Sequence, residues 1–337
     1  MKRLLSGITP SSNQGLHLGN YLGAVKPHIE FQEKGECFYF VADLHSLNTV
    51  FKPEDVTKNT ENIFIEYLAF GINPDKTTFY VQSDIPQITY LQTILNNTVT
   101  VSELSRMHAY KDKLQNHEAG NNISFGLFSY PVLMASDILI FKPDIVPVGE
   151  DQSQHVEIAR EIGKTFNNRY GTILKIPDLY VNKEVARVLG TDGKRKMSKS
   201  LGNVISIFSP EDEIKKQIMN IITDPSRIHP TDPGNPEKNP CFLYLKLIEH
   251  DLLKSDSDPT TLEMEQQYKQ GKIGDVTIKR YLFNSFMQYF KDVRDKKKEL
   301  AKNKDFINEI RVKGQKKATE LAEKTLTEVK NAVGLWK

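Results

Sequence analysis

Short apolar runs alternate with amphipathic stretches through the first half of the chain. The runs lie at residues 4–5, 38–41, 79–81 and 145–148. This alternation is typical of βαβ units, in which helices cover the faces of a parallel sheet. The last three runs end in polar residues, and ligands of open α/β sheets bind beside the carboxyl ends of the strands. The sequence therefore predicts an α/β fold with one shared crevice at that edge.

The first helices are predicted from apolar spacing and from the residues that end them. One helix is expected over residues 18–32, with an interruption near Pro27 because proline lacks the N–H of the helical ladder. A second is expected over residues 53–70 and should end at Gly71.

The domain organisation follows from where the strand pattern stops. We expect an α/β domain over residues 1–208, carrying a helical insertion at about 85–142, and a helical domain over 209–337 with a loop at 224–240. The last helix has a face of small residues that would let it pack back on the α/β domain. That face is formed by Ala318, Leu321, Ala322, Thr325, Val329, Ala332 and Val333.

Composition excludes several classes of protein. Apolar residues make up 39% and charged residues 26% of the chain, the balance of a soluble globular protein. No window approaches the ~18 uncharged apolar residues that cross a bilayer, and the start MKRLLSGITPSSNQ is no secretory signal, so we expect a cytoplasmic protein. Cys37 and Cys241 lack the spacing of a zinc site or a disulfide framework.

The net charge of +2 is unevenly distributed. Residues 291–337 contain 14 Lys and Arg against 8 Asp and Glu, whereas the rest of the chain is slightly acidic. A basic tail of this kind suits a polyanionic partner, and a lysine-rich solvated helix face is the alternative.

The motif His17-Leu18-Gly19-Asn20 opens the first predicted helix after a turn rich in Pro, Ser and Gly. Backbone N–H groups point outward at such a place, so a phosphate is attracted, and glycine lets the ligand approach the backbone. An ordinary structural turn is the alternative. Neither GxGxxG nor GxxxxGK[ST] occurs, so the two commonest phosphate-binding loops are excluded.

A basic loop at residues 194–203, KRKMSKSLGN, is the second candidate. Lysines flanked by glycines can close over a polyphosphate, and a solvated surface loop is the alternative.

Together, the two motifs resemble the paired signatures of class I aminoacyl-tRNA synthetases. The chain is most similar to the tryptophanyl-tRNA synthetases, nearly from end to end. The matching blocks lie at residues 6–11, 19–24, 148–152 and 196–200. Asn20 agrees with the Asn that this family has where most class I enzymes have His. The turn at residues 11–14 is longer than usual, and Leu5 stands where a Phe often covers the amino-acid pocket.

The resemblance implies a Rossmann-like, HUP-type catalytic domain and an all-helical anticodon-binding domain. It implies activation of L-tryptophan by ATP and Mg²⁺ to an adenylate, followed by transfer to tRNA(Trp) without a covalent enzyme intermediate. It also implies a homodimer formed through the catalytic domain, with the apolar stretch 125–140 contributing. Neither a membrane nor DNA is expected as a partner.

The resemblance also assigns nucleotide-binding residues. Lys199, Lys196, His17 and Asn20 are the implied catalytic residues, with Lys199 the leading candidate. Asp151 would bind the ribose hydroxyls, and the Val188 backbone would touch adenine. The full implied ATP site is Thr9, Pro10, Ser11, Gly19, Asn20, Gly149, Glu150, Asp151, Val188, Lys196, Met197, Ser198, Lys199 and Ser200. No protein ligand to a metal is expected, because ATP carries the Mg²⁺.

An acidic residue interrupts the most apolar stretch of the chain. Tyr130, Met134 and Asp137 share one face if residues 124–141 are helical, and Pro131 indicates a kink or a helix start. A buried carboxylate is costly unless it is paired, so Asp137 either bonds to nearby backbone or receives a ligand.

By resemblance, Asp137 accepts the indole N–H and Met134 packs on the ring, whereas tyrosyl enzymes typically have Gln at the Met134 position. Indole has one donor and no acceptor, which suits a lone carboxylate, and phenylalanine would leave that carboxylate unpaired. Tyr130 and Gln152 would lie near the ammonium or carboxylate of the amino acid. The remaining implied pocket residues are His45, Leu5, Val146 and Val148.

Three other functions remain open from the sequence. The same fold could activate tyrosine, or the chain could be a non-catalytic relative kept for binding nucleic acid. The intact lysine loop, residues 149–152 and Asp137 favour a working enzyme. A nucleotidyltransferase of the same fold would lack the long helical tail.

Overall fold

The computed structural model describes residues 1–12, 14–107, 110–111, 124–149, 152–181, 188–253 and 259–336. The chain divides into two compact units. The sheet unit comprises residues 1–13, 26–184 and 300–337, and the helical unit comprises 14–25 and 185–299. This division differs from the predicted boundary after residue 208. Residues 188–208 belong to the helical unit, and the last helix belongs to the sheet unit, where it packs on β3 and α5.

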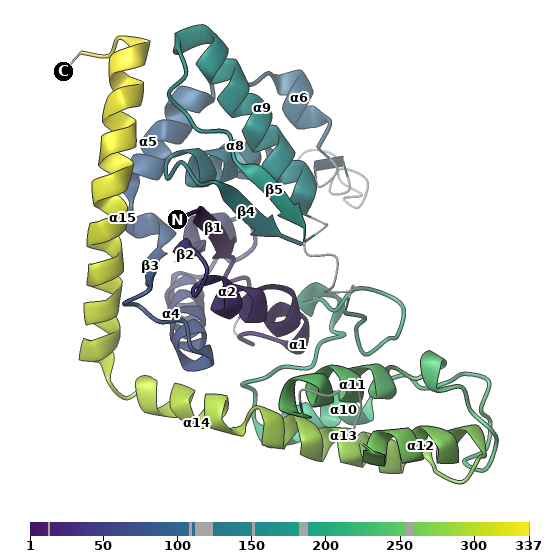
Figure 1. The fold of residues 1–337 in the computed structure, drawn as a ribbon. Coiled ribbons are helices and arrows are strands. Elements are labelled where there is room, and N and C mark those ends of the chain that lie inside the picture. The colour runs from purple at the N-terminus through teal and green to yellow at the C-terminus, as the bar shows by residue number, and fades with distance from the viewer. Residues whose placement is uncertain are drawn as a thin grey trace. The chain divides into compact units, whose positions relative to one another are not determined.

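Five parallel strands form the sheet in the order β3-β2-β1-β4-β5 (Figure 1). The strands are β1 (Arg3–Ile8), β2 (Glu36–Val41), β3 (Thr77–Val81), β4 (Ile145–Val148) and β5 (Asp178–Val181). The four apolar runs are β1 to β4, so the predicted parallel α/β sheet is confirmed. The strand β5 was not predicted, because its residues alternate between exposed and half-buried positions, as an edge strand allows.

The strand order places a topological switch point at the centre of the sheet. β1 pairs with β2 on one side and with β4 on the other, so the chain builds outward in both directions from β1. Ligands of open α/β folds bind outside the carboxyl ends of the strands at such a point. The observed topology therefore supports the predicted crevice at that edge.

Helices cover the sheet, and their ends follow the local sequence signals. The predicted helix 53–70 is α4 (Pro53–Phe70), which starts with proline and ends at Gly71 with a φ of 109°. The other helical elements of this unit are α2 (Lys26–Phe31), α3 (Asp43–Ser46), η2 (Gln82–Asp84), α5 (Pro86–Leu95), α6 (Val101–Ser105), α8 (Phe125–Leu139), α9 (Ser153–Tyr170) and α15 (Lys304–Val333).

The last helix, α15, packs on β3 and α5 with its face of small residues, as predicted. Ala318, Ala322 and Val329 are fully buried there. Gly314 meets the backbone of β3: a Cβ at this position would lie 1.7 Å from the carbonyl oxygen of Phe79. Only glycine permits so close an approach.

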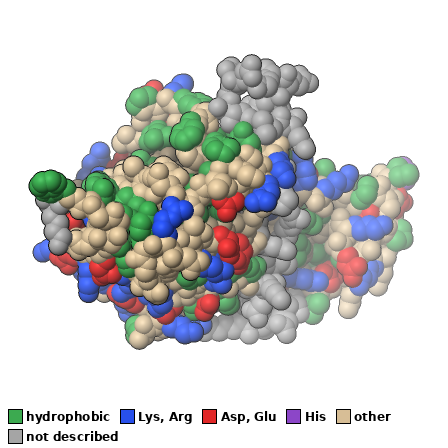
Figure 2. Space-filling view, turned by 90° about the horizontal axis from the view of Figure 1, so that it is seen from above, with side chains coloured by type: hydrophobic (Ala, Val, Ile, Leu, Met, Phe, Trp, Pro, Cys, Tyr) green, Lys and Arg blue, Asp and Glu red, His purple; other side chains and the backbone are tan. Residues whose placement is uncertain are grey.

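The basic residues of α15 are partly neutralised on the sheet unit. Arg311 pairs with Asp84 and Lys313 with Asp75, both at 2.5 Å. Figure 2 shows Lys and Arg side chains interspersed with Asp and Glu on one face of the molecule. These pairs favour a solvated helix face as the reason for the basic composition of α15.

The helical unit contains the segment 14–25 and a group of helices. Its elements are α1 (Leu18–Asn20), the π-helix η1 (Tyr21–Val25), η4 (Lys199–Leu201), α10 (Glu211–Met219), η5 (Pro236–Lys238), α11 (Pro240–Leu253), α12 (Pro259–Lys269), α13 (Asp275–Tyr289) and α14 (Lys291–Leu300). The predicted helix 18–32 is thus divided into α1, η1 and α2, and the π-helix ends at Val25, two residues before Pro27, so the expected interruption near Pro27 is confirmed. Within the described part of the chain, no helix is both long and apolar enough to cross a membrane.

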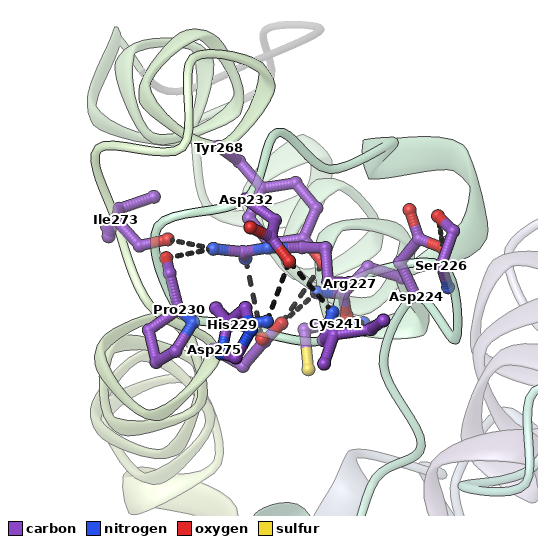
Figure 3. Close-up of polar contacts among 12 residues, drawn as sticks. Asp224, Ser226, Arg227, His229, Pro230, Asp232, Cys241, Tyr268, Ile273 and Asp275 are labelled. Atoms are coloured by element: carbon purple, nitrogen blue, oxygen red, sulfur yellow. Dashed lines mark hydrogen bonds and ion pairs between the residues drawn. The ribbon is translucent and has the colours of Figure 1, made fainter.

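A buried arginine organises the loop between α10 and α11 (Figure 3). The Arg227 side chain is 2% exposed, and its guanidinium lies 3.4 Å from the carboxylate of Asp275. It lies over the ring of Tyr268, 4.2 Å from the centroid, and donates to the backbone carbonyl oxygens of Pro230 and Ile273. Only a planar guanidinium can make all these contacts at once.

We expect Arg227→Ala to lower the free energy of unfolding by about 2–4 kcal/mol, because the half-buried carboxylate of Asp275 and two backbone carbonyl groups lose a buried donor. Arg227→Lys should lose most of the same stability, since an ammonium cannot reproduce the fork. Thermal unfolding followed by circular dichroism measures both. The exposed Arg280→Ala on α13 is the control and should unfold like the wild type. Equal melting temperatures for all three variants would contradict this account.

Candidate active site

The first predicted motif forms a compact cap at the start of α1. The Nδ1 atom of His17 accepts a hydrogen bond from the backbone N–H of Asn20, and the Asn20 side-chain oxygen accepts from the backbone N–H of His17, both at 3.3 Å. A neighbouring antiparallel bridge joins His17 to Ser206. Because Nδ1 accepts, the neutral imidazole carries its proton on Nε2 and can donate there.

The basic loop is held from inside by Asn203, which is 3% exposed. Its Oδ1 accepts from the backbone N–H of Ser198 at 2.8 Å, and its Nδ2 donates to the carbonyl oxygen of Lys196 at 3.2 Å. The backbone N–H of Met197 donates to the carbonyl oxygen of Val188 at 2.9 Å. These bonds fix the backbone of the loop, while the Lys196 side chain is exposed and Lys199 is half-buried.

The two motifs meet in the helical unit although 178 residues separate the atoms in contact. The backbone N–H of Gly19 lies 3.3 Å from the sulfur of Met197. Burial, and then the positive charges of Lys199 and Lys196, lower the pKa of His17 to about 3. The structure therefore places a neutral donor, His17, under the influence of two cations beside Gly19, an arrangement suited to a polyphosphate.

His17 should make stability depend on pH. Its pKa is 6.5 in the unfolded chain and about 3 in the folded protein, so the unfolded chain binds more protons between these values and stability falls as the pH is lowered from 6.5 towards 3. We expect the wild type to lose about 2 kcal/mol more than His17→Gln between pH 7 and 4.5. Urea unfolding at both pH values measures the difference. His28, also buried with a pKa lowered to about 3, contributes equally to both proteins. Identical losses would contradict the assignment.

In the sheet unit, Asp137 is a buried carboxylate surrounded by donors. It lies on α8 and is 1% exposed. The Nε2 atom of His45 lies 2.8 Å from its Oδ2, and the Nε2 of Gln82 lies 2.7 Å from Oδ1 and 2.9 Å from Oδ2. Burial is the largest effect on the pKa of Asp137 and raises it, while the bonds from His45 and Gln82 lower it. The carboxylate thus bonds to side chains from α3 and η2, rather than capping a helix.

Tyr130 and Met134 lie on the same helix and are half-buried, on one face with Asp137. The hydroxyl group of Tyr130 bonds to Nε2 of His155 at 2.6 Å, and burial raises the pKa of Tyr130 to about 12. The ring of Tyr130 also meets that of His45 edge to face, with centroids 6.3 Å apart. Pro131 lies inside α8, which runs without interruption from Phe125 to Leu139.

The other predicted residues are distributed as follows. Leu5 is buried in the core cluster on β1, Val146 is buried on β4, and Val148 packs against the same cluster. Gln152 is exposed before α9. The residues proposed to bind the nucleotide differ in exposure: those on the surface are Thr9, Ser11, Gly149 and Ser200, and those that are buried are Pro10 and Val188. Ser198 is half-buried, and its hydroxyl group lies 3.0 Å from that of Ser200. Glu150 and Asp151 lie outside the described residues.

Two polar residues beside Asp137 and Tyr130 were not predicted. Gln82 could have been suspected, because it is the first polar residue after the third apolar run. No sequence signal distinguishes His155 on α9. No group of three His, Cys, Asp or Glu side chains that could hold a metal ion occurs among the residues that the structure describes.

The comparisons with known proteins agree with this geometry. The family model described as tRNA synthetases class I (W and Y) matches residues 1–291. A tryptophan–tRNA ligase of Fusobacterium nucleatum is 41% identical over 336 residues, covering 99% of this chain and 98% of the relative. One from Borreliella burgdorferi is 40% identical, covering 100% of this chain and 95% of the relative.

A solved structure is similar over the same length. The tryptophanyl-tRNA synthetase of Campylobacter jejuni, crystallised with ADP and tryptophan, has a TM-score of 0.87 and 40% sequence identity. The match covers 99% of this chain and 100% of that one. The chain therefore belongs to the class I tRNA synthetases for tryptophan and tyrosine, and within them to the tryptophan–tRNA ligases.

Proposed function

We propose that this chain activates L-tryptophan with ATP and transfers it to tRNA(Trp). A tryptophan carboxylate oxygen attacks the α-phosphorus of ATP, the bond to the β-phosphate breaks, and pyrophosphate leaves. A hydroxyl of the terminal adenosine of the tRNA then attacks the acyl carbon and AMP leaves. The observation that carries the proposal is the contact of Gly19 with Met197, which brings the lysine loop beside His17, where the charges of Lys199 and Lys196 act on the imidazole.

The cluster supports a catalytic role because adenylate formation needs charge neutralisation more than covalent help. As ATP reacts, negative charge develops on the departing pyrophosphate. Lys199 and Lys196 would neutralise it, and His17 would donate from Nε2. Lysine and neutral donors do not bind cations, so this set fits a Mg²⁺ that arrives on the phosphate oxygens of ATP.

The remaining nucleotide contacts are part of the same proposal. Asn20 and Gly19 would hold the phosphates with Thr9, Pro10 and Ser11. Gly149, Glu150 and Asp151 would hold the adenosine, and Val188, Met197, Ser198 and Ser200 would complete the loop over it.

The pocket around Asp137 would bind the amino acid. Asp137 would accept the indole N–H, Met134 would pack on the ring, and Tyr130 and Gln152 would bind the polar end of the amino acid. His45, Leu5, Val146 and Val148 would shape the pocket. The buried position of Leu5 and Val146 in the core supports a role in shape rather than direct polar contact.

The proposed function also involves two macromolecular partners, tRNA and a second copy of the chain. The basic helix α14, which has no buried residue, would contact tRNA phosphates together with the rest of the helical unit. A homodimer through the sheet unit is proposed by family likeness, and the Phe125 side chain, 74% exposed, would belong to its interface.

ATP–pyrophosphate exchange with tryptophan, tyrosine and phenylalanine in parallel tests the function. We expect exchange with tryptophan alone. Exchange with tyrosine would favour the alternative substrate of the same family, and no exchange with any of the three would favour a non-catalytic role.

A further inference from the structure

The side chain of Gln82 has a defined orientation. It is fully buried at the carboxyl end of β3, in the turn η2. Its Oε1 accepts from the backbone N–H of Leu44 at 3.1 Å, so its Nε2 must face Asp137. A flipped amide would place two donors against each other at Leu44 and two acceptors against each other at Asp137.

The donors around Asp137 leave room for one more. A carboxylate offers about four acceptor positions. Oδ2 receives His45 and Gln82, whereas among the described residues Oδ1 receives Gln82 alone. One acceptor position of Oδ1 therefore remains, which matches the single N–H of an indole.

The turn that carries Gln82 is held on both sides. The Ser83 backbone N–H and hydroxyl group donate to Asp43, at 3.0 and 2.5 Å. The guanidinium of Arg311 on α15 bonds to both oxygens of Asp84, at 2.6 and 2.5 Å. Since paired residues hold Ser83 and Asp84, the backbone beside Gln82 has little freedom to shift.

We propose that Gln82 is a positioning residue that determines amino-acid specificity, by holding the Asp137 carboxylate negatively charged and oriented with one acceptor position left for the indole. This inference rests on the proposed function. The residue acts through Asp137 and needs no contact with the substrate.

The charges around Asp137 explain why a neutral amide is needed. His45 and Asp43 face it from α3, and the fully buried Tyr80 faces it from β3. Burial first, and then the charge of Asp43, raise the pKa of Asp137, while His45 and Gln82 oppose the rise. Removing the Gln82 donor should shift the balance towards the protonated acid, which offers the indole a weaker acceptor.

The variant Gln82→Glu provides a sharp test because it keeps the shape of the side chain. While the introduced carboxyl group is protonated it can still donate to Asp137, whereas two ionised carboxylates at this distance repel. We expect near-normal kcat/KM for tryptophan at low pH and a new alkaline limb between about pH 5 and 8. KM for ATP should stay constant. A pH profile equal to that of the wild type would overturn the proposal.

A second variant tests specificity. Gln82→Met has a similar volume and no donor, so Asp137 should shift towards the protonated acid. Because a neutral acid costs less to bury unpaired than a carboxylate, the penalty for leaving Asp137 without an indole partner should then shrink. We expect the ratio of pyrophosphate exchange with tryptophan to that with phenylalanine to fall by about 10-fold or more. An unchanged ratio would also overturn the inference.

Controls separate this inference from the proposed function. Gln87, on the neighbouring α5, donates to Glu323 at 2.9 Å. Gln87→Glu and Gln87→Met should therefore retain the wild-type pH profile and ratio. A wild type without tryptophan exchange would contradict the proposed function itself, whereas an active wild type with unaffected Gln82 variants would contradict only the inference.

Discussion

Replacing Lys199 with alanine should lower the rate of tryptophan adenylation by about 10³-fold, while tryptophan binding should stay within about twofold of the wild type. The size follows from losing one preorganised donor at the leaving group, since removing a single preorganised donor to a developing negative charge costs about 10²–10³ in rate and this donor is also charged. Lys199 belongs to the helical unit, where its positive charge helps to lower the pKa of His17. The residues proposed to bind tryptophan belong to the sheet unit, so tryptophan binding should not depend on Lys199. Pre-steady-state adenylate formation and equilibrium dialysis with tryptophan measure the two quantities.

The control for Lys199 lies in the same loop. Lys194 is exposed and is not among the proposed contacts to ATP, so Lys194→Ala should keep nearly the full adenylation rate. If Lys199→Ala weakened tryptophan binding as much as it slowed adenylation, the lysine would have a structural rather than a catalytic role.

Asp137→Asn should lower kcat/KM for tryptophan by about 10³-fold. The asparagine presents an amide to Gln82 and His45, so at least one buried donor faces another donor, and each unsatisfied donor costs about 1–3 kcal/mol. The indole N–H loses its charged acceptor as well. Steady-state pyrophosphate exchange measures the loss, with KM for ATP as the internal reference.

A surface carboxylate provides the matched control. Asp75 pairs with Lys313 on the exterior, with its side chain 78% exposed, and Asp75→Asn should leave exchange unchanged. Equal activity of Asp137→Asn and the wild type would exclude Asp137 from tryptophan recognition.

Local signals predicted much of the fold. α4 begins at Pro53 and ends before Gly71 as expected, because proline and glycine impose their backbone preferences without help from distant residues. The buried strands were found because continuous apolar runs need burial on both faces. The edge strand β5 was missed, since pairing decides it rather than periodicity, whereas the interruption of helix 18–32 near Pro27 was expected and only its form as a π-helix was not.

The candidate site also contains residues that the sequence indicates and bonds that only the structure shows. The two phosphate motifs and Asp137 could be selected from the sequence, and Gln82 could have been suspected after the third apolar run. The bond of Gln82 to Asp137, the bond of His155 to Tyr130 and the inner bonds of Asn203 could not be predicted. Such partners come from segments far apart in the chain, and nothing in their local sequence indicates which atoms will meet.

The sequence by itself determined which elements form and which residues have suitable chemistry, because helical spacing, turn residues and side-chain type act over a few positions. Only the tertiary structure decided that Gly19 touches Met197, that Gln82 bonds to Asp137 and that Gly314 fits against β3. These contacts depend on how distant segments pack. Packing minimises buried unpaired polar groups and empty volume over the whole unit rather than along the chain.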